Sequence, residues 1–249
     1  MAILTQQADP APVINGRRGC AAGMADDLQL DIATAQGSDP DTAKAGEVGA
    51  CGVSITTLAD LREALASVYL EAVPVYVQAG ASALPLASLL YSLVLEQDKD
   101  LGNLRGALNF DPLATFAVSG ALPAPLGQLY DEMAALTDYN ARNVPAMGAI
   151  GASGMPWSGA GGNAVQELAF TLGSGVEYLR AMSGRGLEID EAAPLMRFTF
   201  SLGPQFFMEI AKLRAARQLW ARIVEAFGGS RRAARMRLFT RTAIHDKTR

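Results

Sequence analysis

Short apolar stretches and longer amphipathic stretches alternate through most of this chain of 249 residues. The short stretches are rich in Val, Ile, Leu and Phe, and they have the length of strands. Seven are found, at residues 28–33, 52–56, 73–80, 104–110, 144–154, 196–203 and 235–244. The longer stretches repeat their apolar residues at helical spacing. This alternation is typical of parallel sheets with crossover helices, so the sequence predicts an α/β protein.

The clearest helix is expected from Gly203 to Gly229. Pro204 suits its first turn, where a missing N–H costs nothing, and the glycine pair suits its end. Apolar residues recur in between at steps of three and four, at Phe206, Ile210, Leu213, Ala216, Trp220, Val224 and Phe227. One continuous stripe of this kind predicts a long amphipathic helix packed against a core, with Trp220 inside it.

A second long helix is expected at residues 161–186. Asn163 is placed to cap its first turn. Glu167 lies on the face predicted to point toward the sheet, where a salt bridge is the default expectation. Gly173 and Gly175 weaken the helix locally.

Polar, glycine-bearing segments follow several predicted strands directly. They are TAQGSD, QAGAS, NFD, GASG and SLG. In a (β/α)8 barrel such segments form the loops at the catalytic face. A doubly wound open sheet remains an alternative from the pattern alone, although no glycine-rich phosphate fingerprint follows the first strand. We expect a TIM-barrel type fold with seven of its eight strands in residues 28–249, preceded by an irregular arm at residues 1–27.

Composition limits the class of protein. Half of the residues are apolar and 18% are charged, which suits one large globular domain. No run of about eighteen uncharged apolar residues occurs and the first residues lack a secretory pattern, so we expect no membrane partner. Cys20 and Cys51 have no metal-binding spacing, and we expect two reduced thiols in a cytoplasmic protein.

Basic residues are concentrated near the end of the sequence. Residues 212–249 contain eleven Lys and Arg and two acids, which is a net charge of +9; the net −4 of the whole chain therefore leaves −13 elsewhere. A solvated helix face explains such an excess, and contact with cofactor phosphates or with an acidic partner chain is the alternative. The basic residues do not interleave with aromatic ones, so we expect no nucleic-acid partner.

Three segments resemble the acyl-CoA mutases of the methylmalonyl-CoA mutase type, in order and in spacing. LDIATAQGSDPDTAKAGEVGACGVSI, at residues 30–55, is similar to the family's first barrel strand and loop, DLPTxxGYDSDxPxxxGDVGxxGVAI. The other segments are GNAVQELAFTLGSGVEYLRA at 162–181 and FFMEIAKLRAARQLWARIV at 206–224. The resemblance extends from about Leu28 to the last residue.

The resemblance implies a cobalamin-dependent carbon-skeleton isomerase that acts on acyl-CoA thioesters. In this family the CoA chain lies along the barrel axis, and a separate C-terminal domain holds adenosylcobalamin. An arginine binds the substrate carboxylate, because its planar fork pairs with both oxygens. A tyrosine and a histidine near the reacting carbon complete the usual set.

Three residues are candidates for substrate binding. By the resemblance, Thr34 matches a threonine of the family's first loop, and Arg237 lies about where an arginine contacts the CoA phosphates. Asn109, with Asp111, ends the predicted fourth strand at the catalytic face. The alternatives are a structural hydroxyl for Thr34 and a salt bridge or plain solvation for Arg237. Asn109 and Asp111 would instead cap a helix that begins at Pro112.

The family's catalytic positions carry other residues in this chain. By the resemblance, Ser38 stands in place of the tyrosine, Ser119 in place of the carboxylate-binding arginine, and Pro156 in place of the histidine. The only histidine is His245, which is expected at the surface, and the cobalamin-binding DxHxxG signature is absent. The pattern resembles the small, non-catalytic subunit of heterodimeric mutases, which pairs with a catalytic large subunit.

We therefore predict a non-catalytic mutase barrel, without a cofactor of its own, that supports a catalytic mutase chain or forms a homo-oligomer. Acyl-CoA is a candidate ligand, and adenosylcobalamin is expected in the assembly. One alternative is an active mutase barrel that uses a separately supplied cobalamin domain. Another is a binding or chaperone-like module whose open barrel edge pairs with other chains. Whether the chain is a fragment or a split subunit stays open at this point.

Overall fold

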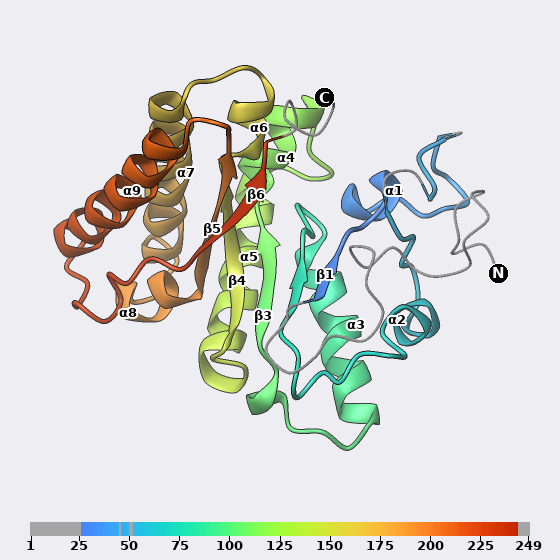
Figure 1. Ribbon diagram of the computed structural model, residues 1–249. Helices are drawn as coiled ribbons and strands as arrows, with labels where there is room; N and C mark the ends of the chain where they lie inside the picture. Colours follow the sequence, from blue (N-terminus) through green and yellow to red (C-terminus); the bar gives the residue numbers. More distant parts are fainter. Residues whose placement is uncertain (1–25, 45, 50–51, 244–249) are drawn as a thin grey trace.

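A computed structural model describes residues 26–44, 46–49 and 52–243. Within these ranges six strands form one parallel sheet, and each strand pairs with its neighbours in sequence order. They are β1 (Asp26–Leu28), β2 (Val75–Val77), β3 (Gly106–Phe110), β4 (Met147–Ser153), β5 (Met196–Leu202) and β6 (Leu238–Thr242). The sheet is curled into a half-barrel of the TIM type with helices on its outer face (Figure 1). The predicted fold class is confirmed.

Long helices cover the outer face of the sheet, and short ones lie in the connections between the strands and the long helices. The long helices are α3 (Ala83–Glu96), α5 (Leu126–Asn143), α7 (Ala164–Ser183) and α9 (Phe206–Ala226). The short ones are α1 (Ile32–Ala35), α2 (Leu58–Ala64), α4 (Pro112–Ser119), α6 (Met155–Gly159) and α8 (Ile189–Ala192), with 3₁₀ turns at Leu101–Asn103 and Ala193–Leu195. Three of the short helices, α1, α4 and α6, lie at the carboxyl ends of the strands (Figure 1).

The strand predicted at residues 52–56 is wrong. Of that stretch, Val53 alone pairs in the described structure, through an isolated parallel bridge to Leu30. A Cβ at Gly52 would lie 2.3 Å from the carbonyl of Leu30, so the two segments meet closely at this one point. The chain then turns at Thr57, which caps α2. The described residues thus hold six strands of the barrel where the sequence predicted seven.

The first strand is also displaced from its predicted position at residues 28–33. It covers Asp26–Leu28, and α1 begins at Ile32. The cause is Asp31, whose carboxylate accepts hydrogen bonds from the N–H of Thr34 at 2.8 Å and of Gly49 at 2.7 Å. A capping carboxylate favours the start of a helix over a longer strand. The arm predicted at residues 1–27, Cys20, Cys51 and His245 lie outside the described residues, except for the start of β1.

The long helix predicted at residues 203–229 is α9. Trp220 is fully buried and meets Phe198 of β5 edge-on, with ring centroids 4.6 Å apart. Gly175 of α7 has no room for a side chain, since a Cβ there would lie 3.0 Å from both rings. The first turn of the predicted stripe is not buried, and Phe206 is 68% exposed. This turn extends past the carboxyl end of β5, where no sheet lies beneath it (Figure 1).

A buried ion cluster joins α7, α9 and β5. Lys212 Nζ lies 2.7 Å from Glu167 Oε2 and 2.6 Å from Glu209 Oε2, and it donates a hydrogen bond of 2.7 Å to the carbonyl oxygen of Ser201. Glu167 Oε1 in turn accepts the N–H of Ser201 at 2.6 Å. The cluster fixes the carboxyl end of β5. The salt bridge predicted for Glu167 is confirmed, as is the N-cap of α7 by Asn163.

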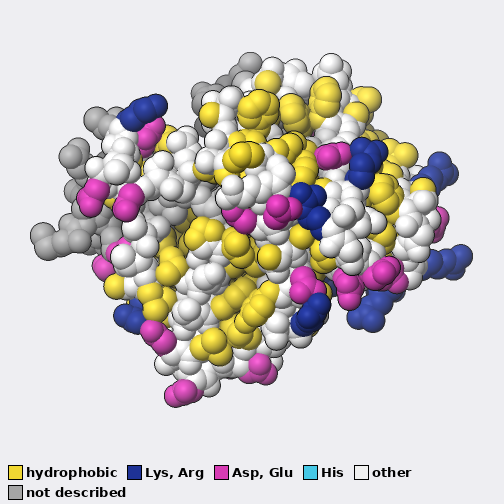
Figure 2. Space-filling model, turned by 180° about the vertical axis from the view of Figure 1, so that it is seen from behind, with side chains coloured by type: hydrophobic (Ala, Val, Ile, Leu, Met, Phe, Trp, Pro, Cys, Tyr) yellow, Lys and Arg dark blue, Asp and Glu magenta, His cyan; other side chains and the backbone are white. Residues whose placement is uncertain are grey.

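Charges are mixed on the outer surface. Figure 2 shows basic and acidic side chains interspersed over the region of α7 and α9, with apolar side chains between them. Part of the basic excess near the end of the sequence is therefore a solvated helix face, which is the first of the two interpretations given for it above. In the described part of the chain no helix is both long and apolar enough to cross a membrane.

Candidate functional site

Polar side chains of the last two strands face the interior of the half-barrel. Phe198 is buried against the helix side of the sheet, so its neighbours along β5 face the opposite side. Thr199 pairs with Phe239 of β6, which places the same alternation in register on both strands. The inward-facing residues are Arg197, Thr199, Ser201, Arg237, Phe239 and Arg241. A charged residue therefore lies at the amino end of both strands, and a second one at the carboxyl end of β6.

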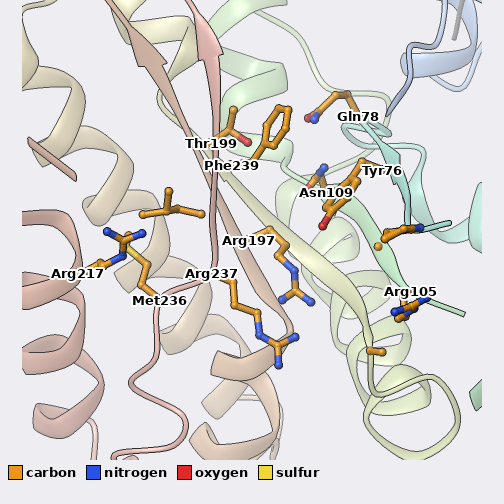
Figure 3. Close-up of a pocket in the computed structure, with 14 residues that line it drawn as sticks. Tyr76, Gln78, Arg105, Asn109, Arg197, Thr199, Arg217, Met236, Arg237 and Phe239 are labelled. Carbon is orange, nitrogen blue, oxygen red and sulfur yellow. The ribbon is translucent and has the colours of Figure 1, made fainter. Parts of the chain in front are cut away.

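A cavity of about 540 Å³ occupies the amino-terminal end of this interior (Figure 3). Four of the described residues that line it are arginines, and none of them is an acid. The arginines are Arg105, Arg197, Arg217 and Arg237. We call this space the arginine cavity. Figure 3 shows that its arginines come from several elements, with Arg197 and Arg237 close together, Arg217 on α9 and Arg105 beside β3.

Arg197 is the most buried of the four, with 8% of its surface exposed. Its Nη1 donates to the carbonyl oxygens of Pro194 at 2.9 Å and Met196 at 3.0 Å. Among the described residues no carboxylate forms an ion pair with it. Burial, and next the positive charge of Arg237, lower the pKa of Arg197 to about 10. Arg197 is still charged at neutral pH, in a position where that charge is not compensated.

Two aromatic rings meet above the arginines. Tyr76 of β2 stacks on Phe239 of β6, with ring centroids 6.0 Å apart and planes inclined by 18°. These strands are not neighbours in the sheet, so the contact crosses the interior. Both rings line the arginine cavity and neither lines the cavity above it. The stack therefore belongs to the arginine cavity.

A second cavity, of about 630 Å³, lies at the carboxyl ends of the strands. Its walls are largely apolar, with contributions from Ile32, Ala35, Ala114, Val118, Met155 and Pro156. We call this space the apolar cavity. It shares Gln78, Asn109 and Thr199 with the arginine cavity, so the two spaces adjoin.

Asp111, in the wall of the apolar cavity, is held in a hydrogen-bond network. Its Oδ1 accepts from the hydroxyl of Tyr178 at 2.5 Å and from the N–H of Ala114 at 3.0 Å, and its Oδ2 accepts from the N–H of Ser153 at 2.7 Å. Burial raises the pKa of Asp111 to about 6, although these hydrogen bonds act in the opposite direction. Asp111 caps α4, which begins at Pro112, so the capping interpretation holds for this residue.

Three of the residues singled out by sequence lie in one place. Asn109, Ser119 and Pro156 all line the apolar cavity. Asn109 has a φ of +49°, a conformation that asparagine tolerates better than most residues, and its amide donates to the carbonyl oxygen of Val77 at 3.2 Å. A register shift in the pairing of β3 with β4 between Ala107 and Phe110 accompanies this conformation. Asn109 therefore lies where the two cavities meet.

The other predicted site residues lie elsewhere. Thr34 and Ser38 line a smaller cavity of about 230 Å³ beside α3. The Thr34 hydroxyl accepts the N–H of Ile55 at 3.1 Å, which is the structural role named as its alternative. Arg237 lines the arginine cavity. The structure thus does not bring Ser38 together with Ser119 and Pro156.

Sequence reasoning missed Arg197, Arg241 and the Tyr76–Phe239 stack. A signal for Arg197 was available, because polar residues alternate with buried phenylalanines along the predicted strand at residues 196–203. Alternation shows only that such residues share one face of their own strand. Which residues meet across the interior depends on the register of the paired strands and on the curvature of the sheet. Neither can be inferred from the residue pattern of a single strand.

Comparison with known proteins agrees with this architecture. The family model described as methylmalonyl-CoA mutase matches residues 20–249. The chain is 37% identical over 217 residues to the methylmalonyl-CoA mutase large subunit of Propionibacterium freudenreichii subsp. shermanii, covering 85% of this chain and 29% of the relative. It is 35% identical over 213 residues to the methylmalonyl-CoA mutase of Rhizobium meliloti (strain 1021), and 34% over 214 residues to that of Escherichia coli (strain K12), in each case covering 85% of this chain and 30% of the relative.

The chain spans about 30% of the length of these curated relatives. The matched region includes every described strand and both cavities. The parallel half-barrel, its two adjoining cavities and the extent of the match lead to one conclusion: this chain belongs to the methylmalonyl-CoA mutase family.

Proposed function

We propose that this chain is the acyl-CoA-binding barrel of a methylmalonyl-CoA mutase-type assembly, and that it supports a catalytic partner chain without catalysing the isomerisation itself. The observation that carries the proposal is the polarity of the interior. Four arginines line one end, and a largely apolar cavity adjoins them at the other. The relatives named above are methylmalonyl-CoA mutases, which is consistent with such a ligand.

An acyl-CoA has the matching polarity. Its phosphates carry several negative charges, and guanidinium groups pair with phosphate oxygens two at a time. Its acyl group is small and largely apolar, which suits the walls at the carboxyl ends of the strands. Because Gln78, Asn109 and Thr199 belong to both cavities, one extended ligand can contact both.

The residues at the carboxyl ends of the strands support a non-catalytic role. The Ser119 hydroxyl is within hydrogen-bonding distance of the carbonyl oxygens of Thr115 and Ala121, at 2.8 and 2.7 Å. A single hydroxyl cannot bind a carboxylate in the bidentate way of an arginine. Pro156 has no side-chain donor and no titratable group, so it cannot act as a general acid or base.

Adenosylcobalamin is assigned to the partner chain in this proposal. When bound, this cofactor supplies the radical chemistry of a carbon-skeleton rearrangement. The described residues do not fit its cobalt, because the one histidine of the sequence is His245 and lies outside them. The described ranges also contain no group of three or more His, Cys, Asp or Glu side chains that could hold a metal ion. A cytoplasmic location, expected from two cysteines without a framework, is part of the same proposal.

Two measurements test the proposal. Isothermal titration calorimetry with CoA and with methylmalonyl-CoA is expected to show binding by the purified chain. A mutase assay with adenosylcobalamin and an added cobalamin-binding domain is expected to show no turnover by this chain, and a tagged chain is expected to co-purify with a longer mutase chain. Turnover in that assay would instead establish the active-barrel alternative, and lack of binding to both CoA and methylmalonyl-CoA would refute the role in acyl-CoA binding.

A further inference from the structure

One wall of the apolar cavity is formed by α4 and the turns that lead from it to α5. We call this segment, residues 113–126, the cavity flap. No residue from 113 to 128 is buried, whereas Pro112 before this stretch and Leu129 after it are buried. A segment with so little buried surface opens at a low free-energy cost compared with the core. The flap is therefore a candidate for local motion while the sheet stays folded.

The flap separates the apolar cavity from solvent. Phe116, on the side of α4 that does not line the cavity, is 52% exposed. Gly120 ends α4 with a φ of +70°, and a Cβ there would meet nothing within 4 Å, so the chain has room to turn at this point. The flap residues that line the cavity are Ala114, Thr115, Val118 and Ser119. Movement of the flap would therefore open the cavity from the side of α4.

Hydrogen bonds attach the flap to the rest of the described structure near its two ends. At the first end, the hydroxyl of Tyr178 accepts the N–H of Leu113 at 3.0 Å. Beyond the second end, the carbonyl oxygen of Gly127 accepts a hydrogen bond of 2.9 Å from Arg185 Nη2. Between these points, and within the described structure, the flap residues hydrogen-bond only to residues close in sequence. The attachment therefore depends on few contacts, and Tyr178 makes the first of them.

Tyr178 and Asp111 form a hydrogen-bonded pair that we call the latch. The Tyr178 hydroxyl donates to Asp111 Oδ1 at 2.5 Å, and the same oxygen accepts the N–H of Ala114 at 3.0 Å. Tyr178 thus holds the first turn of α4 both directly, through Leu113, and indirectly, through Asp111. Burial, and next the charge of Asp111, raise the pKa of Tyr178 well above its ordinary value, so its hydroxyl keeps the proton that it donates. The first N–H groups of a helix have no partner within the helix, and the latch supplies partners for two of them.

We propose that the cavity flap is a lid, which opens the apolar cavity to solvent while the sheet stays folded, and that the latch holds it closed. A molecule in the cavity contacts Ala114 and Val118 and therefore stabilises the closed lid. Opening is a property of the free chain and does not rest on the proposed function. The response to an acyl-CoA does rest on it.

Hydrogen–deuterium exchange of the purified free chain, followed amide by amide by NMR at constant pH, tests the opening. The flap amides are expected to exchange roughly 100-fold or more faster than those of β4, after correction for intrinsic rates. Low concentrations of urea are expected to leave flap exchange unchanged and to accelerate β4 exchange, because only global unfolding exposes a large surface. Flap exchange with the rate and the urea dependence of β4 exchange would overturn the lid.

Tyr178→Phe tests the latch, because it removes one hydroxyl and keeps the ring. Flap exchange is expected to rise roughly ten-fold, which corresponds to the loss of a buried hydrogen bond. Tyr130→Phe is the matched control, since Tyr130 lies edge-on to Tyr178 and its buried hydroxyl has no hydrogen-bond partner among the described residues. Flap exchange in Y130F is expected to equal that of the wild type. Equal rates in Y178F and Y130F would overturn the latch.

A thermal melting curve shows whether each variant is folded. If Y178F does not fold, the Leu113 amide of the wild type decides the role of the latch. This amide is expected to exchange no faster than the Gly120 amide, which is hydrogen-bonded to the carbonyl oxygen of Phe116. Faster exchange at Leu113 would show that the Tyr178 hydroxyl does not hold the first turn of α4, and the latch would be overturned.

Methylmalonyl-CoA connects the lid to the proposed function. At a concentration well above its dissociation constant, measured by calorimetry, it is expected to slow flap exchange by roughly ten-fold or more, because it binds the closed state. Binding without any change in flap exchange would overturn the lid as a cover of the cavity. Absence of binding would overturn the proposed function alone, since the flap and the latch are judged on the free chain.

Discussion

Two buried cations on opposite faces of the same strand have different environments. Lys212 reaches the end of β5 from the helix layer and is 4% exposed, and Arg197 on the inner face of β5 is 8% exposed. Lys212 lies within 2.7 Å of carboxylate oxygens of both Glu167 and Glu209. Arg197 has backbone carbonyl partners but, among the described residues, no carboxylate. Both cations are buried, but Lys212 has two carboxylate partners and Arg197 has none among the described residues.

The difference indicates which charge belongs to the scaffold and which to a ligand. A buried cation that is paired with carboxylates contributes to the stability of the fold, because its partners belong to the same chain. An uncompensated one carries a desolvation cost that an incoming anion can offset, and the lowered pKa of Arg197 expresses that cost. Replacement of each cation by methionine, a side chain of comparable length, turns this contrast into measurements.

The largest effect is expected for Lys212→Met. This change leaves Glu167 buried without its cation, and breaking a buried pair in this way typically costs about 3–5 kcal/mol of unfolding free energy. Urea denaturation followed by circular dichroism measures it. The double variant E167Q/K212M, which removes both charges, is expected to recover a large part of the loss. A single variant as stable as the wild type would show that the cluster is not a structural element.

The next effect concerns Asp111, a buried carboxyl that forms no ion pair among the described residues. Its pKa is about 6 in the folded chain and near the ordinary 3.8 in the unfolded chain, so the folded state binds more protons between these values. Stability from this group is therefore present below about pH 4 and is lost as the pH rises through about 6. The loss is on the order of 3 kcal/mol. Asn cannot titrate in this range, so Asp111→Asn is expected to remove this pH dependence. Denaturation curves of the wild type and of the variant, recorded from pH 4 to 7, measure the unfolding free energy of each.

Arg197→Met is expected to affect binding more than stability. Removal of an uncompensated charge also removes its desolvation cost, so the unfolding free energy should stay the same or rise. The loss of a guanidinium–phosphate contact should weaken CoA binding by roughly ten-fold, measured by titration calorimetry at fixed salt. Arg222→Met on the outer face provides the control with unchanged affinity. A loss of stability like that of K212M would remove the distinction between the two cations.

The smallest effect is expected for Glu209→Gln. Glu209 contributes the more accessible carboxylate of the ion cluster, and Lys212 keeps its contact with Glu167 in this variant. We expect a loss of about 1 kcal/mol or less, in the range of ion pairs that solvent partly screens. The same urea titrations resolve it. A loss equal to that of K212M would mean that the two carboxylates contribute equally.

The scaffold could be predicted because its signals are local. The apolar spacing around Trp220 predicted α9, and the polar side chain of Asn163 predicted the start of α7. The stretch at residues 52–56 failed because β-branched composition does not ensure pairing. Gly52 touches the backbone of Leu30, and Thr57 begins the next cap before a second pair can form.

The candidate site could be predicted only in part. Resemblance to the family placed Ser119 and Pro156 on one cavity, since positions at strand ends follow from fold and motif alone. It grouped Ser38 with them, whereas Ser38 lines a separate space. The meeting of Arg197 with Arg237, and of Tyr76 with Phe239, depends on the register of β5 with β6 and on the curl of the sheet. Such contacts are non-local, and no pattern within one strand encodes them.

The stack of Tyr76 on Phe239 also has a mechanical consequence. It connects β2 to β6, which are not hydrogen-bonded to each other, through side chains alone. The stack therefore acts as a strut, meaning a side-chain contact that holds the two sides of the curled sheet at a fixed distance. At this level the two rings, with centroids 6.0 Å apart, occupy part of the interior. A molecule long enough to contact both cavities must displace this strut or slide past it. Binding of such a molecule would therefore separate the ring of Tyr76 from that of Phe239, and it would loosen the link between the two sides of the sheet.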